Sequence, residues 1–291
     1  MASLQRLSRW ITVERVAAWT LAVLLAAGSV GLWYAATPFH APSDSLSTVR
    51  ADADVTVTAT DAGYVLAPTQ TAGTEATSDA SAGALDSTGL VLYPGARVHP
   101  NAYVPVLAPL VAASGLTVVI PHPPLNLALL DTGAAGRVIE TSEASQSDRF
   151  AGDAGLFDPE RPLAAPSTVE RWYVGGHSLG GVAACRFADA HPNRVAGVVL
   201  FASYCDRDVS DTSLRLLSVT GTADGVLDRT ASREARDRLP PTTTQTVSLD
   251  GVNHTQFGAY RGQRGDRPGT VSYERAHAGL RVTLVEFLTA S

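Results

Sequence analysis

The sequence predicts an α/β fold in which a mostly parallel, twisted sheet carries helices on both faces. From residue 90 onward, short apolar runs alternate with longer segments that suit helices, which is the pattern of consecutive βαβ units. One apolar run passes directly into the glycine-rich turn GGHSLGG at residues 175–181. Roughly 220 residues remain once the N-terminal segment and the polar linkers are set aside, which suits one α/β domain with a large core.

The first 50 residues predict membrane attachment. Residues 16–37 contain no charged side chain and are long enough to cross a bilayer as a transmembrane helix. Arginines precede this segment and none follows until Arg50. The positive-inside rule therefore places residues 1–15 in the cytoplasm and the rest of the chain outside it. Residues 38–50 are expected to form a stalk between the helix and the folded domain.

A cleaved signal peptide is the alternative interpretation of the same segment. Small residues stand near a possible cleavage site, at Ala35, Ala36 and Ala41. The apolar run is longer than the core of a usual signal peptide, which favours an uncleaved signal anchor. The first interpretation predicts a single-pass membrane protein, and the second a secreted one.

Residues 51–291 are expected to form the folded domain. An antiparallel hairpin over residues 55–67 leads the sheet. Two polar stretches, near residues 69–87 and 140–167, lack apolar periodicity and are expected to be flexible insertions. The other expected elements are strands at 90–93, 117–120, 172–174, 195–203, 214–219 and 246–249, and helices at 102–114, 133–139, 182–190, 229–239 and 272–288.

The turn at residues 175–181 predicts a nucleophile elbow. Its G-x-S-x-G pattern consists of Gly176, Ser178 and Gly180, between an apolar strand and a helix-forming segment. In such a turn the serine adopts a strained conformation that exposes its hydroxyl, and the glycines remove Cβ atoms that would clash. The N-terminus of the following helix would stabilise an anion formed at Ser178. Ser178 is therefore the candidate nucleophile.

An acid and a base follow Ser178 in the chain order that such sites use. Asp224 comes just after the strand at 214–219, and His254 just after the strand at 246–249. Open α/β sheets place their sites at these strand ends. A serine hydroxyl is a poor nucleophile, so His254 would take its proton, and Asp224 would orient the imidazole and stabilise the imidazolium. Ser178, Asp224 and His254 form the predicted catalytic triad.

With these motifs the chain resembles the α/β-hydrolases of the small, lidless kind, near the dienelactone-hydrolase-like "alpha/beta hydrolase fold-5" group. The resemblance extends from Val55 to the C-terminus and also rests on residues 90–98, 124–128 and 251–260. Dienelactone hydrolases use a cysteine nucleophile, whereas this elbow carries a serine, so butenolide cleavage is not implied. About ten residues separate the strands where related enzymes insert a lid, which implies an open pocket and small or accessible substrates.

The resemblance also implies an oxyanion hole and a substrate pocket. One donor should be the backbone N–H of Leu179, and the other, by analogy with the histidine-glycine-x loop of such enzymes, the N–H of Ala96. Gly95 would allow the substrate oxygen to approach. Asn126 and Phe257 are candidate pocket residues, although the loop around Phe257 equally suits a cover over the sheet.

Several other residues invite a functional interpretation that the sequence does not favour. His177 is expected to make a structural hydrogen bond, and Asp228 to cap the helix that begins at Arg229. Cys185 and Cys205 are expected to be unpaired buried thiols, although they could form a disulfide if their Cα atoms come within about 7 Å. No metal-ligand spacing and no phosphate loop motif is present, so neither a metal nor another cofactor is expected.

Composition narrows the possible partners. The net charge is −6, whereas domains that bind nucleic acid usually carry a basic patch, so nucleic acid is not an expected partner. The expected partners are a small-molecule ester-like substrate and, through the N-terminal helix, a membrane. The oligomeric state stays open.

The sequence thus predicts a membrane-anchored, extracytoplasmic serine hydrolase, a carboxylesterase that acts through an acyl-enzyme on Ser178. One alternative is a cell-envelope acyltransferase with the same triad, and another is a non-catalytic tethered binding domain. Esters, thioesters and amides share one tetrahedral intermediate, so the bond that is cleaved stays open as well.

Overall fold

The protein is described from a computed structural model, in which two compact units, Met1–Pro38 and Phe39–Ser291, are distinguished. Each unit is considered by itself. The residues that the structure describes are 15–16, 18–26, 28–29, 31, 33, 37–69, 84–147, 163, 165–166 and 168–290.

In the first unit, the structure corrects the predicted transmembrane helix over residues 16–37. None of the helices formed by the described residues combines the length and the apolar composition that crossing a bilayer requires. The predicted signal anchor, membrane partner and single-pass location with an extracytoplasmic domain rested on that helix and are not supported.

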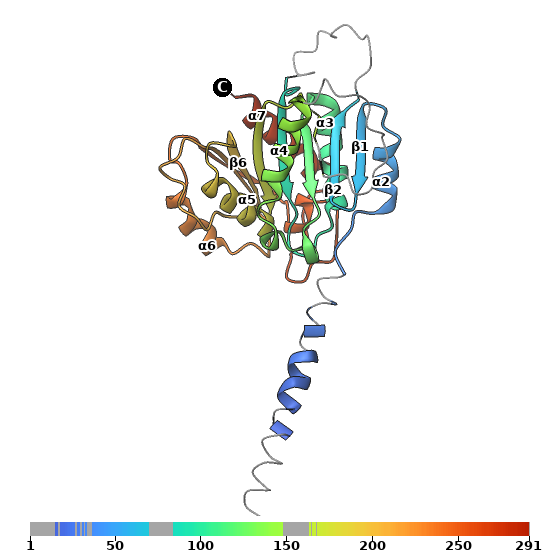
Figure 1. Cartoon of the computed structure of the whole chain (residues 1–291), viewed down its shortest axis with the longest axis vertical. Helices are drawn as coiled ribbons and strands as arrows, with labels where there is room; N and C mark the ends of the chain where they lie inside the picture. Colours follow the sequence, from blue (N-terminus) through green and yellow to red (C-terminus); the bar gives the residue numbers. More distant parts are fainter. Residues whose placement is uncertain are drawn as a thin grey trace, which may run out of the picture. The chain divides into compact units, whose positions relative to one another are not determined.

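The second unit is built on a sheet in which the described residues form eight strands, in the order β1-β2-β4-β3-β5-β6-β7-β8 (Figure 1). Strand β2 runs antiparallel to both β1 and β4, and every other neighbouring pair is parallel. The predicted mostly parallel sheet with a leading hairpin is confirmed. The strands are β1 (Val55–Thr60), β2 (Gly63–Pro68), β3 (Thr88–Tyr93), β4 (Thr117–Pro121), β5 (Arg171–His177), β6 (Gly197–Phe201), β7 (Arg215–Gly221) and β8 (Thr244–Leu249).

Helices cover both faces of this sheet, and each face has its own apolar core. Successive strand residues point to opposite faces, so Leu90 and Leu92 of β3 join one core while Val91 and Tyr93 join the other. The first core packs against α2, α3 and α7, and the second against α4 and α5. The helices are α2 (Ser43–Arg50), α3 (Val104–Ser114), α4 (Ala134–Ser147), α5 (Leu179–Ala190), α6 (Arg229–Glu234) and α7 (Tyr273–Thr289).

Four segments differ from the sequence-based expectation or cannot be compared with it. The expected stalk contains α2, whose Val49 enters the first core. Residues 140–147 of the second expected insertion continue α4. The expected helix at 229–239 divides into α6 and a 3₁₀ turn at Ala235–Arg238. Most of both expected insertions, residues 70–83 and 148–162, lie outside the described residues.

The connection between β6 and β7 is short and contains no helix along residues 202–214, all of which are described. Related enzymes insert a lid domain at this connection, and we expected none here.

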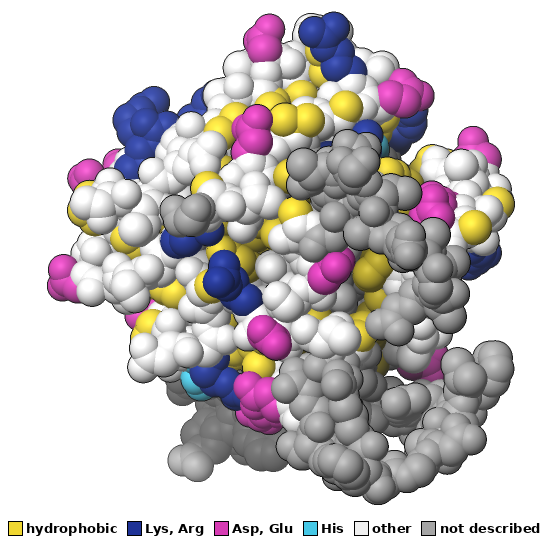
Figure 2. All heavy atoms as spheres, turned by 90° about the horizontal axis from the view of Figure 1, so that it is seen from above, with side chains coloured by type: hydrophobic (Ala, Val, Ile, Leu, Met, Phe, Trp, Pro, Cys, Tyr) yellow, Lys and Arg dark blue, Asp and Glu magenta, His cyan; other side chains and the backbone are white. Residues whose placement is uncertain are grey.

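Charged side chains of both signs share the surface. On the face seen in Figure 2, arginine side chains lie among aspartate and glutamate side chains rather than in a patch of one sign.

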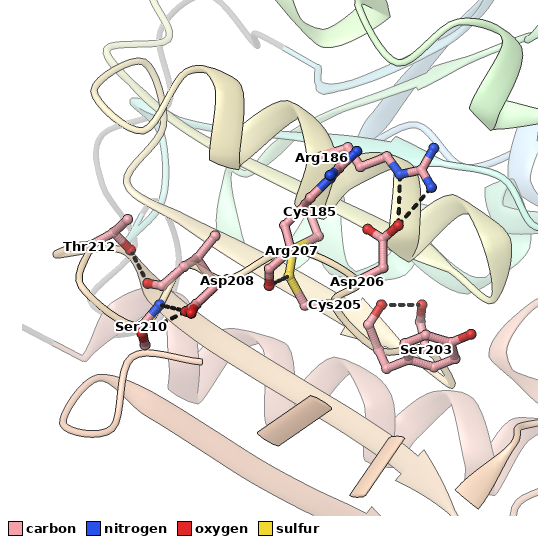
Figure 3. The surroundings of a disulfide bond; sticks show 11 residues. Cys185, Arg186, Ser203, Cys205, Asp206, Arg207, Asp208, Ser210 and Thr212 are labelled. Carbon is pink, nitrogen blue, oxygen red and sulfur yellow. Dashed lines mark hydrogen bonds and ion pairs between the residues drawn. A yellow bond between two sulfur atoms is a disulfide. The ribbon is translucent and has the colours of Figure 1, made fainter. Parts of the chain in front are cut away.

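Cys185 of α5 and Cys205, in the loop after β6, form a disulfide (Figure 3). Their Cα atoms lie 5.5 Å apart, within the range that a disulfide spans. The prediction of two unpaired thiols is therefore wrong. The bridge ties the helix that follows the elbow to the loop of the neighbouring strand.

Candidate active site

Ser178 occupies a strained turn between β5 and α5. Its backbone angles are φ 53° and ψ −124°, in a region that residues other than glycine rarely adopt. A Cβ atom on Gly176 would overlap the carbonyl group of Gly180, and one on Gly180 would overlap the carbonyl oxygen of Tyr93. The two glycines are therefore needed for the turn to form, as the pattern indicated.

Neighbouring groups hold this turn in place. The backbone N–H of Ser178 donates to the carbonyl of Phe201 at 2.9 Å. The hydroxyl of Ser203, in the loop after β6, donates to the carbonyl of Ser178 at 2.6 Å. The backbone N–H of Ser178 is thus held by β6 and its carbonyl by the loop after β6, which fixes the backbone and leaves the side-chain hydroxyl for other contacts.

Asp224 and His254 come together as the sequence predicted. Nδ1 of His254 lies 2.9 Å from Oδ2 of Asp224, and each residue is about 1% exposed. The other carboxylate oxygen accepts the amides of Val226 and Leu227, at 2.8 and 2.9 Å. Burial acts to raise the pKa of Asp224, but the hydrogen bond and charge of His254 and the two amides outweigh it and lower the pKa below its usual value. An ionised Asp224 fixes the His254 proton on Nδ1.

The second ring nitrogen of His254 is available for proton transfer. Nε2 is buried and has no hydrogen-bond partner among the described residues, so the structure shows no hydrogen bond between it and the hydroxyl of Ser178. The imidazole ring nevertheless lies against the elbow, because its centroid is 4.5 Å from that of His177, the residue before Ser178. Such contacts are often loose before a substrate is bound.

Two backbone amides near the elbow are unoccupied, and they are the two predicted for the oxyanion hole. Within the described part of the chain, neither Ala96 N–H nor Leu179 N–H donates to an acceptor. The neighbouring Gly95 N–H is not available, since it donates to the hydroxyl of Tyr103 at 2.9 Å. A Cβ on Gly95 would crowd His177, so the glycine permits the close approach of this loop to the elbow.

Tyr103 is a site residue that the sequence did not single out. It lies at the end of the 3₁₀ turn Pro100–Tyr103, and its hydroxyl is 3.0 Å from Nδ1 of His177. Burial, reinforced by the nearby His254, lowers the pKa of His177 well below its usual value. Nδ1 of a neutral His177 accepts a hydrogen bond from the Tyr103 hydroxyl, and the same hydroxyl accepts a hydrogen bond from the Gly95 amide. The expected structural hydrogen bond of His177 is thus present and joins the oxyanion loop to the elbow.

Asp266 is a second residue that the sequence did not single out. Oδ1 accepts the backbone N–H groups of Gly225 and His254, at 3.2 and 3.1 Å, and Oδ2 accepts the amide of Thr255 at 2.9 Å. The carboxylate therefore joins the loop that carries Asp224 to the turn that begins at His254. Asp266 lies in the polar run after Tyr260, whose composition indicates only turns, so the sequence did not predict this role.

Strained backbone gathers at one edge of the sheet. Within the part of the chain that is described, residues other than glycine with positive φ follow β3, β4, β5 and β6, at the carboxyl ends of these strands. Strain of this kind is often kept at functional sites. The residues are Arg97, Leu125, Asn126, Ser178 and Ala202.

The three predicted pocket residues are all buried. Asn126 is 7% exposed and its Oδ1 lies 3.2 Å from Nε2 of His122. Its carbonyl also accepts the amide of Arg97, which follows the oxyanion loop. Phe257 is fully buried and stacks on His177, the residue before Ser178. Gly95 is buried in the loop described above.

Two other aspartates that follow strands of the sheet make contacts elsewhere. Asp228 caps α6 by accepting the amides of Thr230 and Ala231, as predicted. Asp206 pairs with Arg186 (Figure 3). Among the described residues, no group of three His, Cys, Asp or Glu side chains has the arrangement of a metal site.

The sequence and the fold were compared with those of known proteins. The sequence matches the family described as "Alpha/beta hydrolase family" over residues 89–154 and 161–278, which include the elbow, Asp224 and His254. No curated protein matches the chain.

Solved structures align with the chain at low identity. A predicted CIB-like hydrolase from Thermoplasma acidophilum is 16% identical, with a TM-score of 0.47 over 81% of this chain and 98% of that one. An alpha-beta serine hydrolase homologue from Coxiella burnetii is 15% identical, with a TM-score of 0.47 over 81% and 97%. A monoacylglycerol lipase from Paleococcus ferrophilus is 15% identical, with a TM-score of 0.46 over 68% and 94%.

Proposed function

Because this chain belongs to the alpha/beta hydrolase family, we propose that it is a serine hydrolase that cleaves carboxylic esters through an acyl-enzyme on Ser178. The observation that carries the proposal is the state of His254. Its Nδ1 is bound to Asp224, its Nε2 is buried without a partner in the described residues, and its ring packs on the residue before Ser178. A base with one nitrogen held and the other unoccupied beside a strained serine is the arrangement that nucleophilic catalysis requires.

The roles follow from this arrangement. The hydroxyl oxygen of Ser178 attacks the ester carbonyl carbon and its proton passes to Nε2 of His254. Asp224, whose lowered pKa keeps it ionised, stabilises the imidazolium. The alcohol leaves with the proton from His254, and water then attacks the acyl-enzyme with His254 again as the base.

The negative oxygen of each tetrahedral intermediate would lie between the amides of Ala96 and Leu179. Both N–H groups lack an acceptor among the described residues, which supports their assignment as donors. A single donor of this kind contributes on the order of 10²–10³ to kcat in serine hydrolases. Leu179 is also the first residue of α5, so the positive end of that helix adds to the stabilisation.

Small or accessible esters are the proposed substrates. The connection between β6 and β7 supports this choice, since residues 202–214 add no helix that would cover the strand ends. We expect kcat/KM for short-chain nitrophenyl esters to exceed that for long-chain esters of the same alcohol. A preference for dispersed long-chain esters over dissolved short ones would contradict the proposal.

The first test is covalent labelling of the purified full chain with a fluorophosphonate, followed by mass spectrometry to locate the adduct. We expect one adduct, on Ser178, and none in Ser178→Ala. Ser203→Ala is the matched control, because Ser203 contacts the same turn through its hydroxyl but has no place in the proposed chemistry. Folded protein that is not labelled, or is labelled equally after Ser178→Ala, would contradict the proposed nucleophile.

Product analysis then fixes the reaction. The acyl group is offered as an ester, a thioester and an amide, with and without glycerol as an acceptor. Fastest turnover of the ester with free acid as the sole acyl product is the expected result. Transfer of the acyl group to glycerol would instead identify an acyltransferase that uses the same serine.

A further inference from the structure

Helix α6 has polar residues where a surface helix normally has its apolar stripe. Positions 229, 232, 233 and 236 follow the spacing of one helix face, continued into the 3₁₀ turn Ala235–Arg238, and they are Arg, Ser, Arg and Arg. No residue of α6 is buried. This face therefore does not add to the apolar core.

A cavity of about 120 Å³ lies along this face. Its lining combines three guanidinium groups, two hydroxyl side chains and one aliphatic side chain. The lining residues are Thr220, Leu227, Arg229, Ser232, Arg233 and Arg236. Thr220 belongs to the carboxyl end of β7, so the cavity lies between that strand end and α6.

The arginines of this cavity have acids beside them in the sequence but form no ion pair with them. None of the ion pairs between described residues includes Arg229, Arg233 or Arg236. Asp228, next to Arg229, directs one carboxylate oxygen to two helix amides instead, and the other two acids are Glu234, next to Arg233, and Asp237, next to Arg236. Three cations close together repel one another, and an anion between them removes that repulsion.

One of the three arginines is held in place. Nη2 of Arg229 donates to the carbonyls of Gly221, Thr222 and Asp224, at 3.1, 3.0 and 3.2 Å. Its remaining N–H groups make no hydrogen bond to described residues, and the same is true of the hydroxyls of Thr220 and Ser232. The cavity therefore has a fixed cation and unused donors of two kinds.

We propose that this cavity binds a phosphate group. Guanidinium groups donate paired N–H groups that match the oxygens of phosphate, and hydroxyl donors complete such a shell. The site is separate from Ser178, and its existence does not depend on the ester hydrolysis proposed above. Its ligand is either inorganic phosphate or the phosphate of a small monoester.

Titration of the full chain with sodium phosphate in a calorimeter tests the proposal, with sodium chloride at equal ionic strength as the reference. We expect one phosphate to bind with a dissociation constant below about 1 mM and no saturable binding of chloride. Arg233→Gln with Arg236→Gln should weaken binding by about tenfold or more, since two charge-assisted hydrogen bonds are lost.

Arg275→Gln is the matched control, because Arg275 is exposed on α7, away from the cavity lining, and should bind phosphate as the unaltered chain does. The single variant Arg233→Gln serves if the double variant does not fold. Glycerol 3-phosphate distinguishes the two sources, because tighter binding than inorganic phosphate identifies a monoester, and equal or weaker binding identifies the free ion. Phosphate binding that equals that of chloride, or that survives both arginine substitutions, would overturn the proposal.

Discussion

The carboxylate of Asp266 accepts the backbone N–H of His254 at 3.1 Å. The same oxygen accepts the amide of Gly225, next to Asp224, so one side chain sets the spacing of the two loops that supply the acid and the base. An ionised carboxylate with several amide donors is a strong local constraint. The pairing of His254 with Asp224 is thus fixed by backbone contacts as well as by its own hydrogen bond.

Asp266→Ala should therefore reduce both stability and turnover. Several charge-assisted hydrogen bonds disappear and the amides of Gly225, His254 and Thr255 lose their acceptor, which costs about 2–4 kcal/mol in the free energy of unfolding. We expect kcat to fall at least about tenfold. Urea unfolding and ester hydrolysis measure the two effects, and Asp211→Ala, at an exposed position, is the control that should leave both unchanged.

Tyr103→Phe removes only the hydroxyl that joins Gly95 to His177. The buried Gly95 N–H is left without an acceptor, and we expect a loss of about 1–3 kcal/mol in stability. Because the oxyanion loop loses its anchor, kcat should fall while KM stays near its original value.

Tyr173→Phe is the matched control for this change. Tyr173 is equally buried, and its hydroxyl accepts from Arg215 at 3.0 Å, away from the elbow. The variant Tyr173→Phe should lose stability but keep the kcat of the unaltered chain. An equal loss of kcat in both variants would show that Tyr103 acts through stability alone.

The pH dependence of stability should report on His99. Burial, helped by the neighbouring His40 and His122, lowers the pKa of His99 to about 4. The unfolded imidazole binds its proton near pH 6.5, so between pH 6.5 and 4 the unfolded state binds more protons than the folded one. This part of the stability is complete above pH 6.5 and is lost as the pH falls towards 4.

His99→Asn should weaken that dependence, since Asn carries an oxygen that can accept the Asn101 amide in place of Nδ1 and does not titrate. Urea midpoints between pH 7.5 and 4.5 measure the effect, for which we expect about 1–3 kcal/mol, reduced by solvent screening. His177 and His277 also have lowered pKa values. They contribute equally to the pH dependence of stability in the unaltered chain and in His99→Asn. Parallel pH curves for the two proteins would contradict this assignment.

Reduction of the disulfide should destabilise the folded unit. The bridge closes a loop between residues 20 positions apart, which corresponds to about 3 kcal/mol from restriction of the unfolded chain. Urea unfolding with and without a thiol reductant measures the loss. The variant Cys185→Ala with Cys205→Ala should show a similar loss and no further response to the reductant, whereas a response would point to another target.

Local patterns were sufficient to predict most of the sheet. Each strand from β3 to β7 is an apolar run buried on both faces, and the G-x-S-x-G spacing determined the turn at Ser178. The acid and the base could be placed because each follows a strand end, and parallel strands bring their ends to one edge.

Contacts between distant residues left no such pattern. Tyr103 and Asp266 owe their positions to loops that meet only in the folded chain, and Cys185 and Cys205 meet because α5 packs beside the loop after β6. Helix α2, with the sequence SDSLSTVR, is short and polar and buries only Val49, so no apolar periodicity marks it. In the N-terminal unit, apolar composition alone predicted a helix that crosses a bilayer, and none of the described helices is both long and apolar enough to do so.

The position of β3 between β4 and β5 has a kinetic consequence. Leu90 pairs with Val118 on one side and with Tyr173 on the other, so the second pairing closes a far longer stretch of chain than the first. Pairings between distant segments form slowly. The hairpin of β1 and β2 needs no such search. After dilution from denaturant we expect backbone signals to return before ester hydrolysis does, because the strand that leads into Ser178 is placed only when that long stretch has closed.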